Sequence, residues 1–409
     1  MYSEISKCRI SGNSHLIQVL SLGDQCLTGV FPKSKEEQIT KGPLDLVWCP
    51  ESGLLQLKQS YSLEEMYGLN YGYRSGLNAT MVEHLTLKIN SLLKIARPKE
   101  GDLVLDIGSN DATALKVYDA KLTRIGIDPT GIKFKEYYTE AIHLIPEFFS
   151  SEIFNNYFPN KKAKIVTSIA MFYDLEDPNN FVKDIESILD DEGIWHFEQS
   201  YMPSMLRQNS YDTICHEHLE FYSFRVVKKL LENNGMKIID VLMNSINGGS
   251  FAVTACKKDA TYQQNLPIIN WLLTEEIRME LDTLKPYQDF EKRVYKHREG
   301  FLNLIESLVN NGKKIFGYGA STKGNVLLQF CGITKELVPF IADVNTSKYG
   351  CYTPGTLIQI ISENEAKAIK PDYFLVLPWH FKSSILNREK DYLVNGGKFI
   401  FPFPEIEIV

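Results

Sequence analysis

The 409-residue sequence has few cysteines, little excess charge and no long apolar run. Its seven cysteines are scattered and odd in number, which indicates reduced thiols and not a disulfide framework. The net charge of −7 argues against a nucleic-acid partner, because phosphate contacts need clustered lysine and arginine. No apolar run is long enough to span a bilayer, and the N-terminus has no signal-peptide pattern. We therefore expect a cytoplasmic protein without a membrane partner.

The composition is that of an ordinary globular protein, with 44% hydrophobic and 23% charged residues. Its length allows two or three domains. Strands and helices alternate at a spacing of about 30 residues in the middle of the chain, which predicts a parallel, doubly wound α/β sheet. We divide the chain into a small zinc-ribbon-like domain (1–70), a central Rossmann-like domain (71–260) and a second Rossmann-like α/β domain (261–409).

The central domain is organised around a buried strand that ends at Asp106 and turns at Gly108. A polar lip, residues 109–111, follows, and we expect a helix from about Thr113. A second strand ends at Asp128. Ligands of open α/β sheets bind in the crevice at the carboxyl ends of such strands. The glycine lets the backbone approach a ligand, and the second acid can accept both ribose hydroxyls of an adenosine.

The polar lip favours S-adenosylmethionine over a dinucleotide. Asn110 and Asp111 stand where a dinucleotide turn has its second and third glycines. A carboxyl-lined lip suits a sulfonium and ammonium ligand and repels a pyrophosphate; a ligand-free turn is the alternative. Met171 and Phe172 end a third apolar strand, where they would either hold an adenine or pack in the core. The predicted cofactor-binding residues are Asp106, Gly108, Asn110, Asp128, Met171 and Phe172.

An aromatic and glycine-rich segment, residues 71–78, precedes an amphipathic helix that we expect over residues 79–96. The segment is either a linker between domains or a cover that lays tyrosines over the ligand crevice. Further along, His216 and His218 flank Glu217. Two histidines this close do not face one metal from a helix, where a spacing of four is expected. The triplet suits a loop that presents one imidazole, with a carboxylate beside it, as a base; the alternative is a helix start capped by histidines.

The N-terminal domain contains two short knuckles, Cys8-Arg-Ile-Ser11 and Cys49-Pro-Glu-Ser52. Paired C-x-x-C knuckles indicate zinc, but here each has serine as its second ligand. A neutral serine hydroxyl is a poor zinc ligand, because it would have to ionise. His15 or Cys26 could add a ligand, but we favour a metal-free relic of a zinc ribbon over bound zinc and predict no metal ligands.

The C-terminal domain begins with a long helix expected over residues 285–310. A strand, a glycine turn and a helix follow over residues 314–324. Gly317 and Gly319 fit the first two glycines of a dinucleotide turn, but the third, Gly324, falls late. Residues 321–323 at the helix start could hold a phosphate.

Taken in order, these motifs resemble the nucleotide-sugar C-methyltransferases, three-domain enzymes that methylate C-3 of a nucleotide-linked 4-keto-deoxysugar. The resemblance covers nearly the whole chain, with the knuckle spacing and the stretches Tyr71-Gly-Tyr-Arg-Ser-Gly-Leu-Asn78, Leu105-Asp-Ile-Gly-Ser-Asn-Asp111, Gly126-Ile-Asp-Pro-Thr130, His216-Glu-His218, Gly317-Tyr-Gly-Ala-Ser321 and Pro402-Phe-Pro-Glu405. It implies that His218 is the general base, with Glu217 beside it and Tyr73 near the reacting carbon. It also implies S-adenosylmethionine as cofactor, a sugar nucleotide held by the N- and C-terminal domains, and a monomer.

The sequence departs from this family at three places. Ser11 and Ser52 replace zinc cysteines, Cys215 replaces a tyrosine, and Tyr173-Asp174 stand where some members have a histidine that touches the substrate. The sugar therefore stays open. Three other functions also stay open: an O- or N-methyltransferase, a nucleotide-sugar oxidoreductase that uses the Gly317 turn, and a catalytically silent binding protein.

Overall fold

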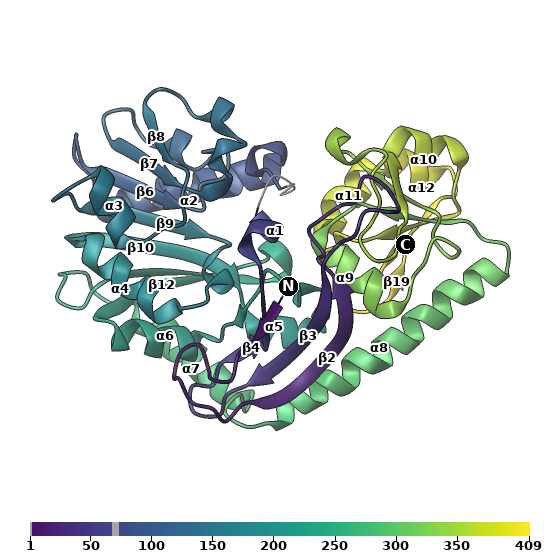
Figure 1. Cartoon of the computed structure of the whole chain (residues 1–409), viewed down its shortest axis with the longest axis horizontal. Helices are drawn as coiled ribbons and strands as arrows, with labels where there is room; N and C mark the ends of the chain where they lie inside the picture. The colour runs from purple at the N-terminus through teal and green to yellow at the C-terminus, as the bar shows by residue number, and fades with distance from the viewer. Residues whose placement is uncertain (1, 68–72) are drawn as a thin grey trace.

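The computed structural model describes residues 2–67 and 73–409, and it arranges them as a β-rich N-terminal unit between two larger α/β units (Figure 1). In Figure 1 the central unit lies on the left and the C-terminal unit on the right. The long strands β2 and β3 lie between them, and helix α8 runs along the lower edge. The boundary predicted at residues 70 and 71 falls outside the described residues.

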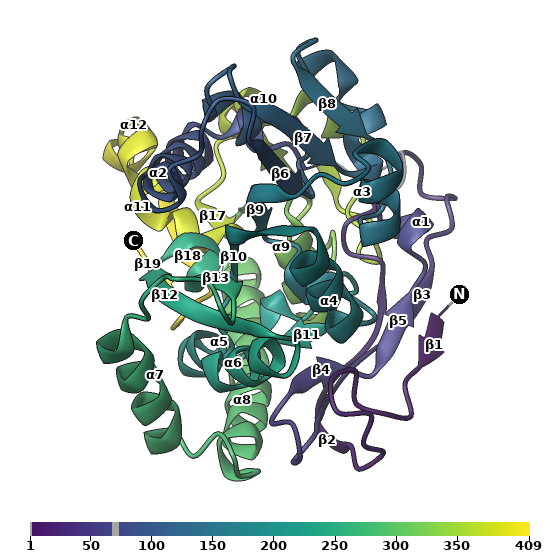
Figure 2. The ribbon, with the colours of Figure 1, turned by 90° about the vertical axis from the view of Figure 1, so that its left-hand side faces the viewer.

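The N-terminal unit is a four-stranded antiparallel sheet in the order β11-β4-β3-β2, beside a two-stranded sheet of β1 and β5. Its elements are β1 (Tyr2–Glu4), β2 (Ile17–Cys26), β3 (Lys41–Trp48), β4 (Leu55–Leu57), β5 (Gln59–Tyr61) and α1 (Leu63–Tyr67). Strand β11 (Glu220–Phe221) comes from the central segment, directly after the histidine triplet, and Figure 2 shows it beside β4. Strand pairing therefore connects the central unit to the N-terminal sheet directly after the candidate base, His218.

The central unit is a seven-stranded sheet in the order β12-β13-β10-β9-β6-β7-β8. Strand β13 runs antiparallel to both of its neighbours, and the other six strands all point in one direction. Its strands are β6 (Leu103–Ile107), β7 (Thr123–Ile127), β8 (Ile142–Ile145), β9 (Ala163–Ile169), β10 (Leu189–Ser200), β12 (Met236–Asn244) and β13 (Ser250–Lys257). This confirms the predicted α/β sheet, with an antiparallel pair at one edge.

Apolar residues on both faces of this sheet are buried by helices. Along β6, Val104 joins a core beneath α2 (Ala79–Ala96), whereas Leu105 joins the core on the opposite face. That opposite face is covered by α3 (Ser151–Tyr157), α4 (Pro178–Ile188) and α6 (Phe224–Asn233), on which α7 (Leu266–Arg278) packs. Helix α5 (Met202–Gln208) and the one-turn elements η1 (Ser75–Leu77), η5 (Phe172–Asp174) and η6 (Tyr211–Thr213) follow strand ends or loops.

The helix expected from Thr113 is wrong, because this segment forms only a single 3-10 turn, η2 (Leu115–Val117). Asn110 and Ala112 have φ of +49° and +60°, so the first residue that can enter a right-handed helix is Thr113. Ten residues then remain before β7. Five-residue strands span about 16 Å, which an α-helix at 1.5 Å per residue crosses only with about eleven residues. The chain therefore returns in a more extended form.

The C-terminal unit begins with α8 (Lys285–Asn310) and builds a six-stranded sheet in the order β16-β15-β14-β17-β18-β19, parallel except for β19. Its strands are β14 (Ile315–Tyr318), β15 (Phe340–Asp343), β16 (Gln359–Ser362), β17 (Tyr373–Val376), β18 (Lys398–Phe401) and β19 (Glu407–Ile408). Its remaining helices are α9 (Thr322–Cys331), α10 (Glu363–Ile369), α11 (Lys382–Arg388) and α12 (Lys390–Val394).

The N-terminal unit shares its core with both neighbours. Trp48 packs on Tyr287 of α8, with ring centroids 5.3 Å apart, inside a cluster that continues into the C-terminal sheet. Cys8, Cys49 and Leu54 instead belong to the core of the central sheet. The N-terminal unit therefore packs between the two larger units and contributes apolar residues to the core of each. Within residues 2–67 and 73–409, no helix combines the length and apolar character needed to cross a membrane.

Candidate active site

The predicted cofactor turn forms at the carboxyl ends of β6 and β7. Gly108, with φ of +72°, donates its amide to the carbonyl of Ile127 at 2.9 Å. The Asn110 amide donates to Asp128 Oδ2 at 2.7 Å, and the backbone and hydroxyl of Thr130 donate to Asp128 Oδ1 at 2.7 and 2.6 Å. The acid on the second strand is therefore held against the turn on the first, in the arrangement that the sequence predicts.

Asp106 lies beneath this turn as a nearly buried carboxyl group. It is 5% exposed, and its Oδ1 accepts a hydrogen bond from Thr167 Oγ1 at 2.5 Å. Burial raises the pKa of Asp106 to about 7; the Thr167 hydrogen bond lowers it and the Asp128 charge adds to the rise. A cation bound nearby would offset the cost of ionising this acid. The carboxyl groups of Asp106 and Asp128 at this turn therefore suit the positively charged sulfonium and ammonium groups of S-adenosylmethionine.

Met171 and Phe172 diverge in the structure. The Met171 side chain faces the turn, because a Cβ built on Gly108 would lie 3.3 Å from its Cγ. Phe172 is fully buried and stacks on Tyr222, with ring centroids 5.3 Å apart and planes at 14°. The prediction that Phe172 lines the crevice is therefore corrected, since its ring fills the aromatic core that the sequence left as the alternative.

The aromatic segment before α2 covers the polar lip. The Ser75 amide donates to Asn110 Oδ1 at 3.0 Å, and the Gly76 amide donates to Asp111 Oδ2 at 3.0 Å. A Cβ on Gly76 would lie 2.5 Å from that same carboxylate oxygen, so a larger residue here would displace the Asp111 carboxylate. The described part of the segment, residues 73–78, therefore lies against the polar lip, as a cover would. Sequence reasoning had not assigned Asp111 this anchoring role.

Two further side chains fix the cover to the turn. Asn110 Nδ2 donates to the carbonyl of Tyr73 at 3.2 Å, and Arg74 Nε lies 3.5 Å from Asp111 Oδ2. Arg74 also donates to the Tyr137 hydroxyl at 2.6 Å. The backbone carbonyl of Tyr73 thus contacts the cofactor turn. Tyr73 is 48% exposed, which leaves its ring accessible to a ligand. Tyr71 and Gly72 lie outside the described residues.

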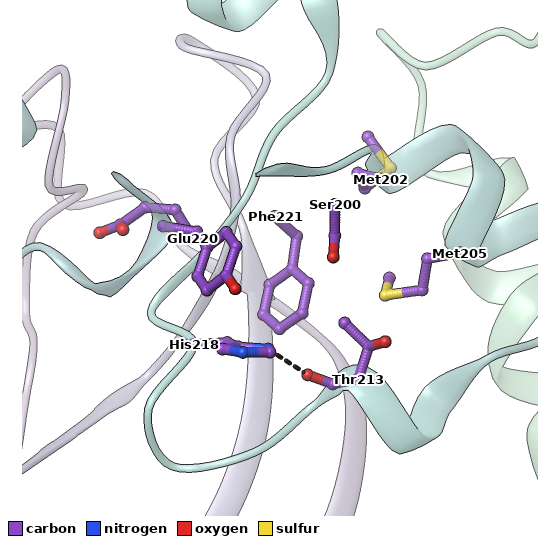
Figure 3. Close-up of a pocket in the computed structure, with 8 residues that line it drawn as sticks. Ser200, Met202, Met205, Thr213, His218, Glu220 and Phe221 are labelled. Carbon is purple, nitrogen blue, oxygen red and sulfur yellow. Dashed lines mark hydrogen bonds between the residues drawn. The ribbon is translucent and has the colours of Figure 1, made fainter. Parts of the chain in front are cut away.

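His218 lies in the loop between η6 and β11, as the loop reading of the triplet predicts (Figure 3). Its Nδ1 is 2.7 Å from the carbonyl oxygen of Thr213, which can only accept, so Nδ1 carries the proton and Nε2 carries the lone pair. Burial, and then the charge of Lys323, lower the pKa of His218 to about 3. The imidazole is therefore neutral at physiological pH and able to accept a proton.

The segment after β9 connects His218 to the cofactor turn. Met171 lies over Gly108, and two residues later the Tyr173 ring meets the His218 ring edge-on at 4.4 Å. The Leu219 amide also donates to the Tyr173 carbonyl at 2.8 Å. The candidate base therefore lies at the same edge of the central sheet as the candidate cofactor site.

A small cavity adjoins His218. It is lined by Tyr173, Ser200, Met202, Met205, Thr213, His218, Glu220 and Phe221, as Figure 3 shows for the labelled side chains. Its volume is about 10 Å³, which is room for one water molecule and not for a sugar ring.

Glu217 lies where the three units meet. A Cβ on Gly29 would clash with Glu217 Oε1 and would lie 3.8 Å from Thr322 Oγ1, so the carboxyl abuts the N-terminal backbone near the start of α9. Burial raises the pKa of Glu217 to about 7, against a weak hydrogen bond from the Cys215 thiol at 3.6 Å. Near neutral pH this carboxyl can therefore accept or donate a hydrogen bond.

The first histidine of the triplet has a structural place. His216 is 1% exposed, its Nε2 is 3.1 Å from the carbonyl of Gln25, and its ring meets Tyr61 edge-on at 4.6 Å. It therefore fastens the loop to the N-terminal sheet and does not face a substrate.

The glycine turn of the C-terminal unit repeats the geometry of the cofactor turn. The Ala320 amide donates to Asp343 Oδ2 at 2.7 Å, as Asn110 does to Asp128. Here, however, Lys348 Nζ donates to the Ala320 carbonyl at 2.6 Å and lies 4.4 Å from the Phe31 ring centroid. An ammonium thus lies at the edge of this second turn, where the first has acids.

The four knuckle positions converge, but their chemistry does not fit zinc. Cys8 Sγ lies 3.2 Å from Ser52 Oγ, and Ser11 Oγ lies 3.6 Å from Cys49 Sγ. Two thiols and two neutral hydroxyls do not make a structural zinc donor set. Among the residues that the structure describes, no group of three or more histidine, cysteine or acidic side chains could hold a metal ion.

Three family models match the chain in the order of its units. One described as "Putative zinc binding domain" matches residues 8–67, one described as a methyltransferase domain matches residues 78–241, and one described as a C-methyltransferase C-terminal domain matches residues 245–404. The protein is an S-adenosylmethionine-dependent methyltransferase.

The chain is also similar over its length to the C-methyltransferase NovU of Streptomyces niveus. The two are 28% identical over 409 residues, which are 99% of this chain and 97% of NovU. With the match at the C-terminal unit, this similarity supports membership of the C-methyltransferase family.

Solved methyltransferases resemble a smaller part of the chain. An S-adenosylmethionine-dependent methyltransferase from Clostridium acetobutylicum ATCC 824 is 13% identical, with a TM-score of 0.35, over 43% of this chain and 92% of that chain. Magnesium protoporphyrin IX methyltransferase (ChlM) from Synechocystis PCC 6803, with bound SAH, is also 13% identical, with a TM-score of 0.33, over 44% of this chain and 87% of that one.

Proposed function

We propose that the protein methylates a carbon next to the ketone of a nucleotide-linked deoxysugar, at C-3 of a 4-keto sugar. The observation that carries the proposal is the state of His218. Its Nδ1 donates to the Thr213 carbonyl, so Nε2 keeps its lone pair. The ring lies at the same edge of the central sheet as the cofactor turn. A neutral imidazole in this place suits the removal of a proton from carbon.

Carbon methylation needs a base before it needs a methyl donor. A proton on a carbon next to a ketone is weakly acidic, so a base must take it while the developing oxyanion is stabilised. His218 Nε2 takes this proton, and Glu217 beside it in the triplet orients or polarises the reacting groups. When bound, S-adenosylmethionine supplies a methyl group that is already activated.

The remaining groups hold the reactants. Asp106, Gly108, Asn110 and Asp128, with Met171 over the turn, would bind S-adenosylmethionine, and residues 73–78 would lie beside it. We assign the sugar nucleotide to the junction of the three units, where Glu217 meets the backbone at Gly29 beside the start of α9. We expect a cytoplasmic monomer.

Hydrogen exchange isolates the proposed base from methyl transfer. The wild-type enzyme, given a 4-keto-sugar nucleotide in D₂O without cofactor, should incorporate deuterium at C-3. His218→Asn should slow this exchange about 10²–10⁴-fold, because it removes the general base. Its affinity for S-adenosylmethionine should stay near that of the wild type.

Two outcomes would overturn the assignment. Normal exchange and turnover by His218→Asn would show that another group is the base. A methylated product that retains deuterium from a C-3-labelled substrate would show O- or N-methylation, since only carbon methylation must lose that label.

A further inference from the structure

The first turn of α9, in the C-terminal unit, is packed against the segment that carries His218. The helix is capped by Ser321, whose Oγ accepts a hydrogen bond from the Gly324 amide at 3.0 Å. Farther along, the Tyr211 hydroxyl lies 3.3 Å from Cys331 Sγ, and the Tyr211 ring meets Phe330 edge-on at 5.2 Å. Helix α9 therefore has a fixed position on η6 and the loop that follows it.

The N-terminal unit fixes the same helix from the other side. Asn325 Nδ2 donates to the Thr28 carbonyl at 2.8 Å, and the neighbouring Gly29 meets both Glu217 and Thr322. Lys323 lies between these anchored residues, in the first turn of α9. Its side chain is partly buried, so it has left bulk water without being sealed in a core.

The charged and titratable groups that surround Lys323 define its place. Asp212 and Cys215, from the segment before the triplet, both raise its pKa, although burial has the larger effect and lowers it. The Lys323 charge in turn lowers the pKa of His218 and of His380. Asp212 is itself held by Trp379, whose Nε1 donates to its Oδ2 at 2.8 Å. The Lys323 charge is therefore close enough to act on the candidate base at the junction of the central and C-terminal units, where α9 packs on η6.

We propose that Lys323 is a catalytic residue of the C-terminal unit that stabilises the enolate oxygen formed when His218 removes the C-3 proton. This inference rests on the proposed function. The C–H bond breaks and its electron pair forms the C=C bond of the enolate. The proton goes to His218 Nε2, and the carbonyl π pair moves to the oxygen, which the Lys323 ammonium binds.

The chemistry of this pair explains why a cation is needed here. A histidine with a pKa of about 3 is unprotonated near neutral pH, but it is a weak base. Enolisation therefore needs a group that stabilises the developing oxyanion. A cation in a partly buried site acts more strongly than one in water, because the local dielectric is lower.

The test compares Lys323→Met with Lys335→Met in the deuterium exchange at C-3 without cofactor. Lys335 lies in the same unit and its side chain is 56% exposed, so its loss removes one positive charge without touching the site. Lys323→Met should slow exchange about 10²–10³-fold, as the loss of an oxyanion partner does, with a change below about tenfold in sugar-nucleotide affinity. Lys335→Met should exchange at the wild-type rate. Lys323→Arg, which keeps the charge, should recover part of the rate and shows that the fold tolerates replacement.

The pH profile separates contact with the substrate from an effect through His218 alone. Loss of a contact lowers the exchange rate at every pH, including the plateau. If Lys323→Met only moves the acid limb to higher pH, as expected when His218 is relieved of a nearby charge, the proposed contact is wrong. It is also wrong if Lys323→Met exchanges within about threefold of the wild type. If the wild-type enzyme catalyses no deuterium exchange on any keto-sugar nucleotide, the proposed function itself is wrong. That result differs from a failure of the Lys323 proposal alone, in which the wild type exchanges and Lys323→Met does so equally well.

Discussion

Replacing Asp106 with asparagine tests whether the carboxyl beneath the glycine turn couples cofactor affinity to pH. Asp106 is 5% exposed and its pKa is raised to about 7, so near neutrality half of the cofactor-free protein holds this proton. A sulfonium and an ammonium group brought to the turn favour the ionised carboxylate. Cofactor binding should therefore release a proton from Asp106.

The magnitude follows from the pKa. If the cofactor binds only the ionised form, its dissociation constant increases by a factor of 1 + 10^(7 − pH). This factor is about 1.1 at pH 8, about 2 at pH 7 and about 11 at pH 6. At pH 7 the same linkage predicts a release of about half a proton per cofactor bound. Asp106→Asn cannot ionise, so it should bind more weakly at pH 8, with an affinity that no longer changes from pH 8 to pH 6 through this residue.

Titration calorimetry measures both quantities at once. Binding of S-adenosylmethionine at pH 6, 7 and 8, in two buffers of different ionisation enthalpy, gives the dissociation constants and the protons released. Asp128→Asn is the comparison variant, because it removes the predicted ribose acceptor on the neighbouring strand and leaves the Asp106 carboxyl in place. It should bind more weakly at every pH and release less than half a proton at pH 7, because loss of the Asp128 charge lowers the pKa of Asp106. Wild-type binding without proton release at pH 7, or unchanged release by Asp106→Asn, would refute the reasoning.

Two further substitutions test the junction of the units and the knuckles. Burial raises the pKa of Glu217 from 4.5 to about 7, so its contribution to stability is full below about pH 4.5 and declines as pH rises through 7. Relative to the wild type, Glu217→Gln should therefore gain a few degrees more in melting temperature at pH 8 than at pH 5, and its turnover should be lower. A variant that melts below the wild type at pH 8 would contradict this. Ser11→Cys combined with Ser52→Cys should create a four-thiol site, since both serines already lie against the partner thiols. Elemental analysis should find about one zinc per chain in the double variant and no stoichiometric zinc in the wild type, and stoichiometric zinc in the wild type would refute the metal-free interpretation.

The arrangement of the central sheet was readable from local patterns. Apolar runs that end in an acid predicted β6 and β7, and the helix periodicity predicted α2 with the same bounds, residues 79–96. These features depend on neighbours within a few residues, and the turn at Gly108 needs a positive φ that glycine adopts readily. The acids at 106 and 128 then meet because parallel strands end at one edge of a sheet.

Contacts between distant segments were beyond such patterns. Met171 and Phe172 are adjacent and both apolar, yet one faces the turn and the other fills the core, because successive side chains after a strand point to different surroundings. The ten residues from Thr113 to Leu122 could have formed a helix by propensity, but the distance back to β7 requires a more extended path.

The approach of Lys323 to His218 comes from packing over more than 100 residues of sequence. Helix α9 is positioned by η6 on one side and by the N-terminal backbone at Thr28 on the other, and β11 pins the histidine loop to the N-terminal sheet. Residue types and spacing could predict the glycine turn and point to a candidate base, since those are local chemistry. Which cation lies near that candidate base depends on how the three units bury their apolar surfaces against one another, and short-range periodicity carries no information about that.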